Sequence, residues 1–569
     1  MRNPVASTSI LRSNERVIPD DIDRVARESF GIDQLKPAQR DAIEAAIDGR
    51  DVLGVLATGY GKSVMYQIAA TLREGVTVVV SPLIALQEDQ LVGIENAPDA
   101  PAAVALNSAG GARRTREAWR MLRSGQAEFV LLAPEQLAKE EVMAALAELE
   151  VSLLVVDEAH CIASWGHDFR PDYLMLGAAA ERLGRPPIMA LTATASTPVR
   201  AEISRRLGLR DPFECIGELD RTEITLTVRR HTQEAEKRAA VEDEVVELPK
   251  PGLVYTATRR DTEQYAERLQ ERGLRAAAYH AGMSGTARGQ VHEDLLGDRL
   301  DVVVATSAFG MGIDKPNVRF VVHADAPESV DAYYQEVGRA GRDGEAAQAT
   351  LHFRPEDLAL RKYFAGRKPA GGEIRRLLRA LDGGTRKRAE LAEESGLSAR
   401  RVTALLALLS DTGHVRIGRS GVTLLARGDI GVAVADALER VEERERIDQS
   451  RIEMMRSYAE TRRCRRQVLL GYFGDELEGP CGNCDTCAAG VADGGGDEIE
   501  GGADAGFEVD DAVRHREWGP GTVMSVEEDR MTVFFDAEGY RVLSLELIEE
   551  HGLLESVPSA AEGTATLKS

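Results

Sequence analysis

The stretch ATGYGKS combines two glycines, a lysine and hydroxyl residues within a few positions of each other. Gly59 and Gly61 allow a tight backbone turn whose N–H groups can point at phosphate oxygens. Lys62 can then meet terminal phosphates, and Ser63 can bind the Mg²⁺ that accompanies them. The strict phosphate-loop pattern has Gly where this chain has Leu56, so the motif departs from it at one position. The predicted nucleotide-binding set is Thr58, Gly59, Gly61, Lys62 and Ser63.

Two carboxylates directly follow the apolar run VSLLVV, in the tetrapeptide DEAH. Asp157 can hold Mg²⁺ through its waters, and Glu158 can polarise a water that attacks the terminal phosphate. An ordinary strand that ends in two solvated acids would carry the same letters. Because a phosphate loop with Lys62 precedes them in the same chain, we favour a site for ATP and Mg²⁺.

Four of the six cysteines fall in one C-terminal stretch, CRRQVLLGYFGDELEGPCGNCDTC. In a cytosolic protein such clustering indicates a metal site rather than disulfides. Four thiolates satisfy a tetrahedral Zn²⁺, and an iron–sulfur cluster also uses four thiolates. The predicted ligands are Cys464, Cys481, Cys484 and Cys487.

The elements that must position these residues are short runs rich in Val, Ile and Leu. DVLGVLA, VTVVVSP, FVLLAP, LLVVDEA and PIMALTAT are continuous apolar segments joined by helical stretches, as expected for a parallel sheet covered on both faces. A second alternation, GLVYTAT, AAAYHAG, DVVVATSAFG and ATLHFRP, has no phosphate loop of its own. We therefore predict an α/β protein with two parallel-sheet domains that share one nucleotide.

The second alternation includes YYQEVGRAGRDG, which predicts a helix that carries two arginines. Arg339 and Arg342 stand at i and i+3, so they would project from one helix face. Two guanidiniums aimed across a cleft can stabilise the charge on a transferring phosphoryl group. A solvated face or a clamp for nucleic-acid phosphates is the alternative. The neighbouring ATSAFGMGIDKPNV favours the cleft, which Asp314 could organise.

Together these motifs resemble those of the RecQ family of superfamily 2 DNA helicases, over most of residues 30–345. FGIDQLKPAQRDAI resembles the family's adenine-reading segment, and ALTATA resembles the element that couples hydrolysis to motion. VVSPLIALQEDQ, ALNS and APEQL resemble segments that grip single-stranded nucleic acid. The resemblance implies two RecA-like domains in an ATP-dependent helicase that translocates 3′ to 5′ and unwinds DNA in repair or recombination.

The resemblance also implies roles for individual residues. Gln39 would bind the adenine edge, although Lys36 stands where Arg is commoner in the family. Arg342, together with Arg339, would act as an arginine finger, and Gln335 would lie close to the phosphates. For the cysteine cluster, the resemblance implies a structural zinc ion rather than an iron–sulfur cluster.

Three residues after DEAH comes SWGHDFRPDY, which looks like the aromatic-rich loop of RecQ helicases. Trp165 and Phe169 can stack on bases, while His167 and Arg170 can reach phosphates. Trp165 and Phe169 could equally form a small buried plug. His160, which precedes the loop, is expected to contact the second domain. A DNA-binding loop in this place could set the position of the adjacent catalytic acids.

The segment after the second domain departs from the family arrangement. Residues 361–401 carry twelve Lys or Arg against five acids, and the order of helix, turn, helix and hairpin predicts a winged helix. Arg400 and Arg401 open its second helix, so DNA phosphate contacts are favoured over a packing or protein-binding role. The hairpin VRIGRSGVTLL is the candidate for strand separation.

The C-terminal part is predicted to hold a long helix that leads to the cysteines, an acidic glycine-rich linker and a small five-stranded barrel. The barrel resembles the Tudor-like or SH3-like modules appended to bacterial helicases such as UvrD and PcrA. It could bind a protein partner such as RNA polymerase, or it could contact nucleic acid. The expected contact surface comprises Arg514, His515, Arg516 and Trp518.

Length and composition set bounds on these interpretations. A chain of 569 residues is expected to hold about three to five domains, and its net charge of −24 argues against nucleic acid only if charge is evenly spread. Without a long apolar run or a signal-peptide core, we expect a cytoplasmic, nucleoid-associated bacterial protein. The predicted units are a tail 1–20, RecA-like domains 21–217 and 218–357, a winged-helix-like domain 358–430, a long helix with a zinc subdomain 431–488, a linker 489–506, the barrel 507–556 and a tail 557–569.

Three other functions stay open from the sequence. A DNA-stimulated translocase that does not separate strands is favoured by the displaced winged helix. An RNA helicase stays open because motor domains that grip mainly the backbone do not distinguish the two nucleic acids. A non-catalytic adaptor for DNA or protein is disfavoured by the catalytic set of Lys62, Asp157, Glu158 and Arg342.

Overall fold

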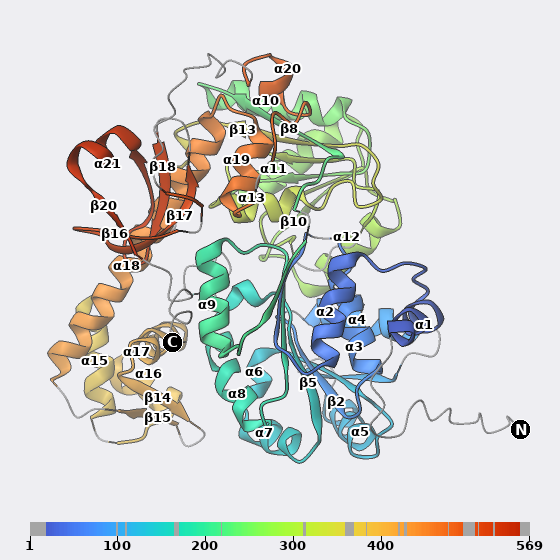
Figure 1. Cartoon of the computed structure of the whole chain (residues 1–569), viewed down its shortest axis with the longest axis vertical. Coiled ribbons are helices and arrows are strands. Elements are labelled where there is room, and N and C mark those ends of the chain that lie inside the picture. Colours follow the sequence, from blue (N-terminus) through green and yellow to red (C-terminus); the bar gives the residue numbers. More distant parts are fainter. Residues whose placement is uncertain are drawn as a thin grey trace, which may run out of the picture.

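Two α/β domains lie one above the other in the computed structural model, and the later elements run largely along one side of both (Figure 1). The described residues are 19–57, 59–82, 84–97, 101–107, 111–163, 170–217, 219–310, 315–358, 369–382, 384–418, 421–425, 429–475, 477–492, 507–509, 511–526 and 530–557.

The first domain is built on a seven-stranded sheet in the order β3-β4-β2-β5-β6-β1-β7, whose described strand pairs are all parallel. Val78 and Val80 enter the core on one face, and Val79 enters the core on the other. Continuous apolar runs are therefore required, because both faces are covered. The strands are β1 (Val52–Val55), β2 (Val76–Val80), β3 (Ala103–Leu106), β4 (Phe129–Leu132), β5 (Val151–Val156), β6 (Ile188–Thr192) and β7 (Phe213–Ile216).

The helices of this domain connect the strands and cover the sheet. They are α1 (Pro19–Phe30), α2 (Pro37–Ile47), α3 (Lys62–Thr71), α4 (Ile84–Asn96), α5 (Gly111–Arg123), α6 (Pro134–Leu137), α7 (Glu140–Ala147), the 3₁₀ turns η1 (Ala159–Ile162) and η2 (Pro171–Met175), α8 (Leu176–Arg182) and α9 (Thr197–Leu207).

The second domain repeats this plan with a six-stranded parallel sheet in the order β10-β11-β9-β12-β13-β8. The predicted pair of RecA-like domains is confirmed, and the change of domain falls between β7 and β8. The strands are β8 (Ile224–Arg230), β9 (Gly252–Tyr255), β10 (Ala276–Tyr279), β11 (Val302–Ala305), β12 (Phe320–His323) and β13 (Ala347–Phe353). The helices are α10 (Glu234–Glu247), α11 (Arg259–Glu271), α12 (Gly285–Leu296) and α13 (Val330–Val337).

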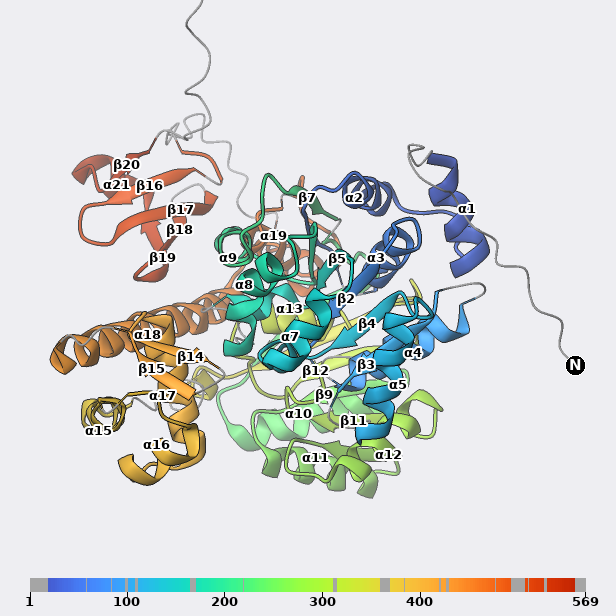
Figure 2. The ribbon, with the colours of Figure 1, turned by 90° about the horizontal axis from the view of Figure 1, so that it is seen from below.

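A small helical module with one hairpin follows, in the order predicted for a winged helix. Gly396, at φ +67, ends the second helix of the module. The apolar side chains of the module form a separate core with those at the beginning of the long helix. Figure 2 shows the module beside that helix. The elements are α15 (Gly371–Leu381), α16 (Arg388–Ser395), α17 (Ala399–Asp411), β14 (Val415–Gly418) and β15 (Gly421–Leu424).

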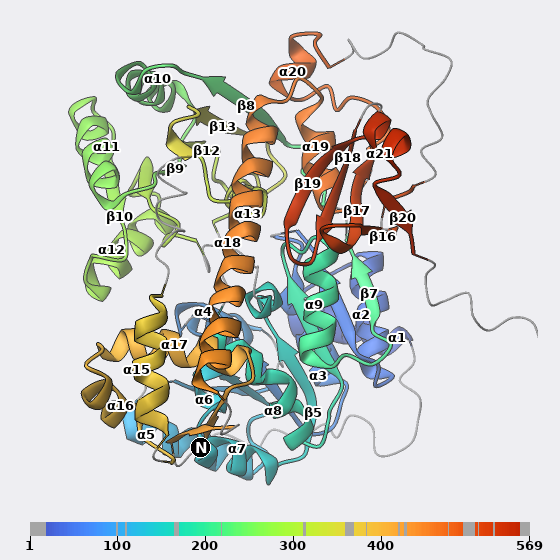
Figure 3. The same ribbon diagram turned by 90° about the vertical axis from the view of Figure 1, so that its left-hand side faces the viewer.

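One helix of 31 residues, α18 (Ile430–Glu460), joins this module to the second domain (Figure 3). Val434 and Ala437 pack in the core of the winged-helix module, whereas Met455 and Tyr458 pack in the core shared with the second domain. Two short helices follow at the cysteine cluster, α19 (Arg465–Tyr472) and α20 (Asp485–Ala488). In the part of the chain that the structure describes, no helix combines the length and apolarity that a bilayer crossing requires.

The last module holds an antiparallel five-stranded sheet in the order β19-β18-β17-β16-β20, and its closure into a Tudor-like or SH3-like barrel stays a prediction. Its expected contact surface needs a correction, because His515 is buried and stacks on Trp518 at a ring-centroid distance of 4.0 Å. Trp518 is half-buried and packs on Phe535, against the core of the module. Arg514 and Arg516 are exposed. The elements are β16 (Ala512–His515), β17 (Gly519–Val526), β18 (Arg530–Phe535), β19 (Gly539–Ser544), α21 (Leu545–His551) and β20 (Leu554–Ser556).

Candidate active site and metal centre

The phosphate loop ends at the first residue of α3, so the N-terminus of that helix faces the candidate site. Gly59 and Gly61 have φ of +85° and +86°, a backbone conformation that glycine adopts without strain. The Lys62 ammonium donates to the Leu56 carbonyl at 3.0 Å, which folds its side chain over the loop. Burial lowers the pKa of Lys62, and the carboxylates of Glu158 and Asp157 oppose that effect. The N-terminus of α3 and the Lys62 ammonium together favour a bound anion.

Asp157 and Glu158 stand at the carboxyl end of β5, beside the phosphate loop. The Gln90 amide of α4 donates to Asp157 Oδ2 at 2.9 Å, and the Tyr173 hydroxyl donates to the Asp157 carbonyl at 3.0 Å. Burial raises the pKa of Asp157, while Lys62 and the Gln90 hydrogen bond lower it. Glu158 adopts φ +49, a strained conformation for a residue with a Cβ. The acids are thus held in a fixed orientation.

His160 connects the catalytic acids to the ALTATA segment. Its Nδ1 lies 2.8 Å from Thr192 Oγ1 and 3.3 Å from Glu158 Oε2. Thr192 ends β6, and its hydroxyl donates to the Thr194 carbonyl at 3.0 Å. These contacts lie inside the first domain, and the expected contact of His160 with the second domain stays a prediction.

Arg342 reaches the phosphate loop from the second domain. A Cβ atom at Gly59 would lie 3.5 Å from Arg342 Cγ, so the stem of this arginine lies against the loop. Its positive charge also contributes to the lowered pKa of Lys62. The structure therefore brings Lys62, Asp157, Glu158 and Arg342 together across the two domains, although they are far apart in the sequence.

The expectation that Arg339 and Arg342 project from one helix face is wrong. Helix α13 ends at Val337, and Gly341 turns the chain at φ +63 between the two arginines. Arg339 is buried inside the second domain, where a Cβ atom at Gly310 would lie 3.4 Å from its Nη2. Gln335 is half-buried on α13, and Asp314 lies outside the described residues, as does Thr58.

Gln39 links the start of α2 to the phosphate loop. Its Oε1 accepts from the Lys36 N–H at 2.9 Å, and its Nε2 donates to the carbonyls of Tyr60 at 2.8 Å and Gly61 at 3.3 Å. The Lys36 ammonium lies 3.8 Å from the centroid of the Tyr60 ring. The residue expected to read adenine is therefore placed directly beside the loop expected to hold phosphates.

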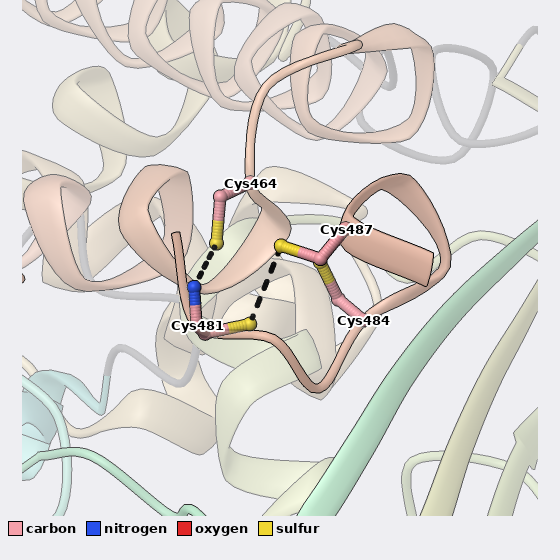
Figure 4. A group of neighbouring side chains, drawn as sticks. All are labelled: Cys464, Cys481, Cys484 and Cys487. Carbon is pink, nitrogen blue, oxygen red and sulfur yellow. Dashed lines mark hydrogen bonds between the residues drawn. The ribbon is translucent and has the colours of Figure 1, made fainter. Parts of the chain in front are cut away.

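The four clustered cysteines converge on one point (Figure 4). Their sulfur atoms all lie within 4.8 Å of one another, which fits four thiolates around one tetrahedral metal ion. The backbone N–H of Cys481 donates to Cys464 Sγ at 3.3 Å, and that of Asn483 donates to Cys481 Sγ at 3.3 Å. Such N–H groups stabilise the negative charge of thiolate ligands. Asn483 also accepts from Thr225 at 2.7 Å, so the cluster covers the edge strand β8.

The residues expected to contact nucleic acid are only partly described. Arg170 donates through Nη1 to the Pro82 carbonyl at 2.9 Å, which ties the end of the aromatic loop to VVSPLIALQEDQ. Arg400 is exposed at the start of α17, and Arg401 forms an ion pair with Glu373 at 2.6 Å. The other three expected contacts, Trp165, His167 and Phe169, lie outside the described residues.

Two residues of this site were not singled out by sequence reasoning, namely Gln90 and Tyr173. Gln90 belongs to VVSPLIALQEDQ, which was expected to grip nucleic acid, yet its amide holds Asp157. A usable signal existed, because α4 follows β2, and β2 is the direct neighbour of β5 in the parallel sheet. Helices that follow adjacent parallel strands begin at the same sheet edge.

Three known protein families match successive parts of the chain. Residues 36–202 match the DEAD/DEAH box helicase family, residues 236–344 match the helicase conserved C-terminal domain, and residues 427–488 match the RecQ zinc-binding family. The probable ATP-dependent DNA helicase RecS of Bacillus subtilis is 33% identical over 461 residues, which cover 81% of this chain and 90% of RecS. The chain belongs to the RecQ family of helicases.

Two further RecQ relatives are longer than this chain. The ATP-dependent DNA helicase RecQ of Haemophilus influenzae is 35% identical over 81% of this chain and 63% of its own length. The protein of the same description from Pasteurella multocida is 35% identical over 80% of this chain and 61% of its own length. The chain thus spans about three fifths of the length of these two RecQ helicases.

Proposed function

We propose that this RecQ-family chain is an ATP-dependent DNA helicase that couples ATP hydrolysis to 3′–5′ translocation and duplex unwinding in DNA repair or recombination. One observation carries the proposal, namely that Arg342 of the second domain lies against the phosphate loop of the first. A nucleotide bound at Lys62 would touch both domains, and loss of its terminal phosphate would release them. DNA held by both domains would then shift by a short step in each cycle.

The first domain supplies the nucleotide-binding groups in this proposal. Lys62 binds the terminal phosphates, and Gln39 reads the adenine edge beside the same loop. Ser63 and Asp157 would hold Mg²⁺, which would neutralise charge on the transferring phosphoryl group. Asp157 fits this role because two side chains fix its orientation in the site. Glu158 orients and polarises the attacking water.

The second domain supplies the arginine finger. Arg342 stabilises the charge that develops on the phosphoryl group, as its place beside the phosphate loop supports. Arg339 supports the wall of the cleft from inside the second domain, next to Gly310. Gln335 and Asp314 are proposed to complete that wall.

DNA would contact both the motor and the winged-helix module. We propose that Trp165 and Phe169 stack on bases of single-stranded DNA, with His167 and Arg170 on phosphates. Arg400 and Arg401 are proposed to contact duplex phosphates. A protein partner such as RNA polymerase at the C-terminal module, and a cytoplasmic, nucleoid-associated location, are further proposals that a DNA helicase of this kind suggests.

Zinc at the four cysteines is proposed to be structural. The four ligands leave no open coordination position for chemistry, and the cluster lies against strand β8 rather than in the ATP cleft. The ion would therefore fasten α19 and α20 to the second domain.

A translocase that does not separate strands is the second candidate function. It is favoured by the small size of the hairpin proposed to split the duplex, because β14 and β15 have four residues each. The motor parts would be unchanged, so the two functions differ only in strand separation.

The deciding experiment compares ATP hydrolysis on single-stranded DNA, forked DNA and single-stranded RNA with unwinding of the fork, with Lys62→Ala as the inactive control. A DNA helicase requires DNA-stimulated hydrolysis together with unwinding. Hydrolysis without unwinding would assign the translocase, and equal stimulation by RNA would refute DNA specificity. Equal activity of Lys62→Ala would refute the motor altogether.

A further inference from the structure

The C-terminal module (507–557) is seated on α18 through the turn between β18 and β19. Gly539 has φ +73, and a Cβ atom there would lie 3.0 Å from Ile447 Cα, so the turn touches the helix backbone itself. The Arg446 guanidinium donates to the Ala537 carbonyl at 2.9 Å, and the Tyr540 N–H donates to Ser450 Oγ at 3.0 Å. The turn therefore packs closely against α18, and main-chain atoms of both the turn and the helix take part in the contact.

From this seat, Tyr540 reaches the first domain. Its hydroxyl lies 3.0 Å from Ser196 Oγ, and the two side chains are 5% and 0% exposed. Figure 3 shows the module beside α18 and close to α9, the helix that begins directly after Ser196. A hydrogen bond between two hydroxyls without access to water is costly to lose, because the hydroxyl that remains would lose this partner while staying buried.

Ser196 is only a few bonds away from the catalytic residues. It follows ALTATA, in which Thr192 donates to the Thr194 carbonyl and lies 2.8 Å from His160 Nδ1. His160 lies 3.3 Å from the Glu158 carboxylate. A short path of covalent bonds and hydrogen bonds, completed by the 3.3 Å contact between His160 and Glu158, therefore leads from the C-terminal module to the proposed catalytic acid.

The other side of Tyr540 leads to the second domain. Its ring lies 5.2 Å from that of Tyr472 in α19, and the Tyr472 hydroxyl donates to Asp331 Oδ2 at 2.6 Å. Arg451 of α18 lies 3.7 Å from the same carboxylate. Asp331 belongs to α13, the helix that precedes the Arg342 turn. Two tyrosines from accessory modules thus bridge the two halves of the ATP site.

We propose that Tyr540 is a positioning residue for ATP hydrolysis, which makes the C-terminal module an internal activator of the motor. By holding Ser196 it fixes the ALTATA segment with His160 and Glu158. Through Tyr472 it stabilises the arrangement in which Arg342 lies beside the phosphate loop. This role rests on the proposed ATP-dependent motor function. The positioning role depends on the hydroxyl group of Tyr540. Phenylalanine at this position would keep the ring contacts and remove only that group.

The test is a double-mutant cycle with Tyr540→Phe and Ser196→Ala in the full chain, read as kcat and KM for ATP with single-stranded DNA present. Tyr540→Phe is expected to lower kcat about three- to tenfold, the factor that one buried hydrogen bond supplies, with KM for ATP changed less than twofold. The double variant should be no slower than the slower single variant, because both changes remove the same bond.

Tyr458→Phe is the matched control. Its hydroxyl is also buried, but it lies 3.4 Å from the hydroxyl of Tyr333 in the second domain, and among the described residues no hydrogen bond joins it to the first domain. It should lower the melting temperature about as much as Tyr540→Phe while leaving kcat within twofold of wild type.

Two outcomes would overturn the positioning role in an active wild-type protein. One is a Tyr540→Phe kcat within twofold of wild type, and the other is losses that multiply in the double variant. A wild-type protein that hydrolyses no ATP with DNA would instead refute the proposed function, and this inference with it.

Discussion

The hydrogen bond from Gln90 to Asp157 gives the sharpest prediction about the ATP site. Gln90→Leu keeps the size of the side chain and removes the amide that donates to Asp157 Oδ2 at 2.9 Å. Hydrogen bonds to charged groups contribute about 1.5–3 kcal/mol. If the bond aims the carboxylate at Mg²⁺ during hydrolysis, its loss corresponds to a decrease in kcat/KM of about tenfold to a hundredfold.

The same change has a definite effect on pH dependence. The Gln90 hydrogen bond lowers the pKa of Asp157 against the opposing effect of burial, so Gln90→Leu raises that pKa further. Activity that needs ionised Asp157 should then be lost at a higher pH on the acid side. The assay is DNA-stimulated ATP hydrolysis as a function of pH and Mg²⁺ concentration, and the variant should also need more Mg²⁺ for half-maximal rate.

Gln87→Leu is the control for this prediction. Gln87 lies almost one turn earlier on α4, is fully buried, and donates to the Ser81 carbonyl at 3.0 Å, which is not a charged group. Its replacement should destabilise the fold without moving the acid limb or the Mg²⁺ requirement. Equal shifts in the two variants, or an unchanged Gln90→Leu enzyme, would refute the assignment of Gln90 to Asp157.

Three further predictions follow from the same geometry. Asp157→Asn should abolish hydrolysis yet raise the free energy of unfolding near neutral pH, because burial raises the folded pKa of Asp157 above its unfolded value. The stability that this difference contributes is present below the unfolded pKa and is lost as pH rises through the folded pKa, so lower stability than wild type at pH 7 would contradict the prediction. Removal of zinc by a chelator, or Cys484→Ala, should lower the melting temperature before it alters the KM for ATP, and a stable zinc-free protein would refute the structural role. Arg342→Ala should lower kcat about a thousandfold or more, with the affinity for ATP changed far less. Arg339→Ala should chiefly lower the stability of the protein, because Arg339 is buried. Equal losses of kcat in the two variants without destabilisation would show that both arginines act as arginine fingers.

Much of the ATP site could be predicted because the residues of each motif are neighbours in the chain. Gly59, Gly61 and Lys62 adopt the turn that their types require, with both glycines at positive φ. Asp157 and Glu158 end a buried strand, as the apolar run before them indicated. Local sequence is sufficient here, since backbone turns and strand ends depend on residues only a few positions apart.

Helix ends and surface assignments were less predictable. Arg339 and Arg342 were placed on one helix face by spacing alone, but α13 ends before either of them. His515 was expected on a contact surface, yet it stacks on Trp518 inside the C-terminal module. For His515 and Trp518 the outcome also depends on Phe535 of β18, a packing partner that the segment itself does not contain.

The sequence by itself determined the family, the two parallel-sheet domains and the presence of four clustered cysteines, because these depend on strand periodicity and on short motifs with fixed spacing. Only the tertiary structure decided that Arg342 meets the phosphate loop, that Gln90 holds Asp157, and that Tyr540 joins Ser196. The two hydrogen-bonded pairs are 67 and 344 residues apart in the sequence. The physical reason is that such contacts arise from how whole domains pack, and no spacing within one segment encodes the position of another.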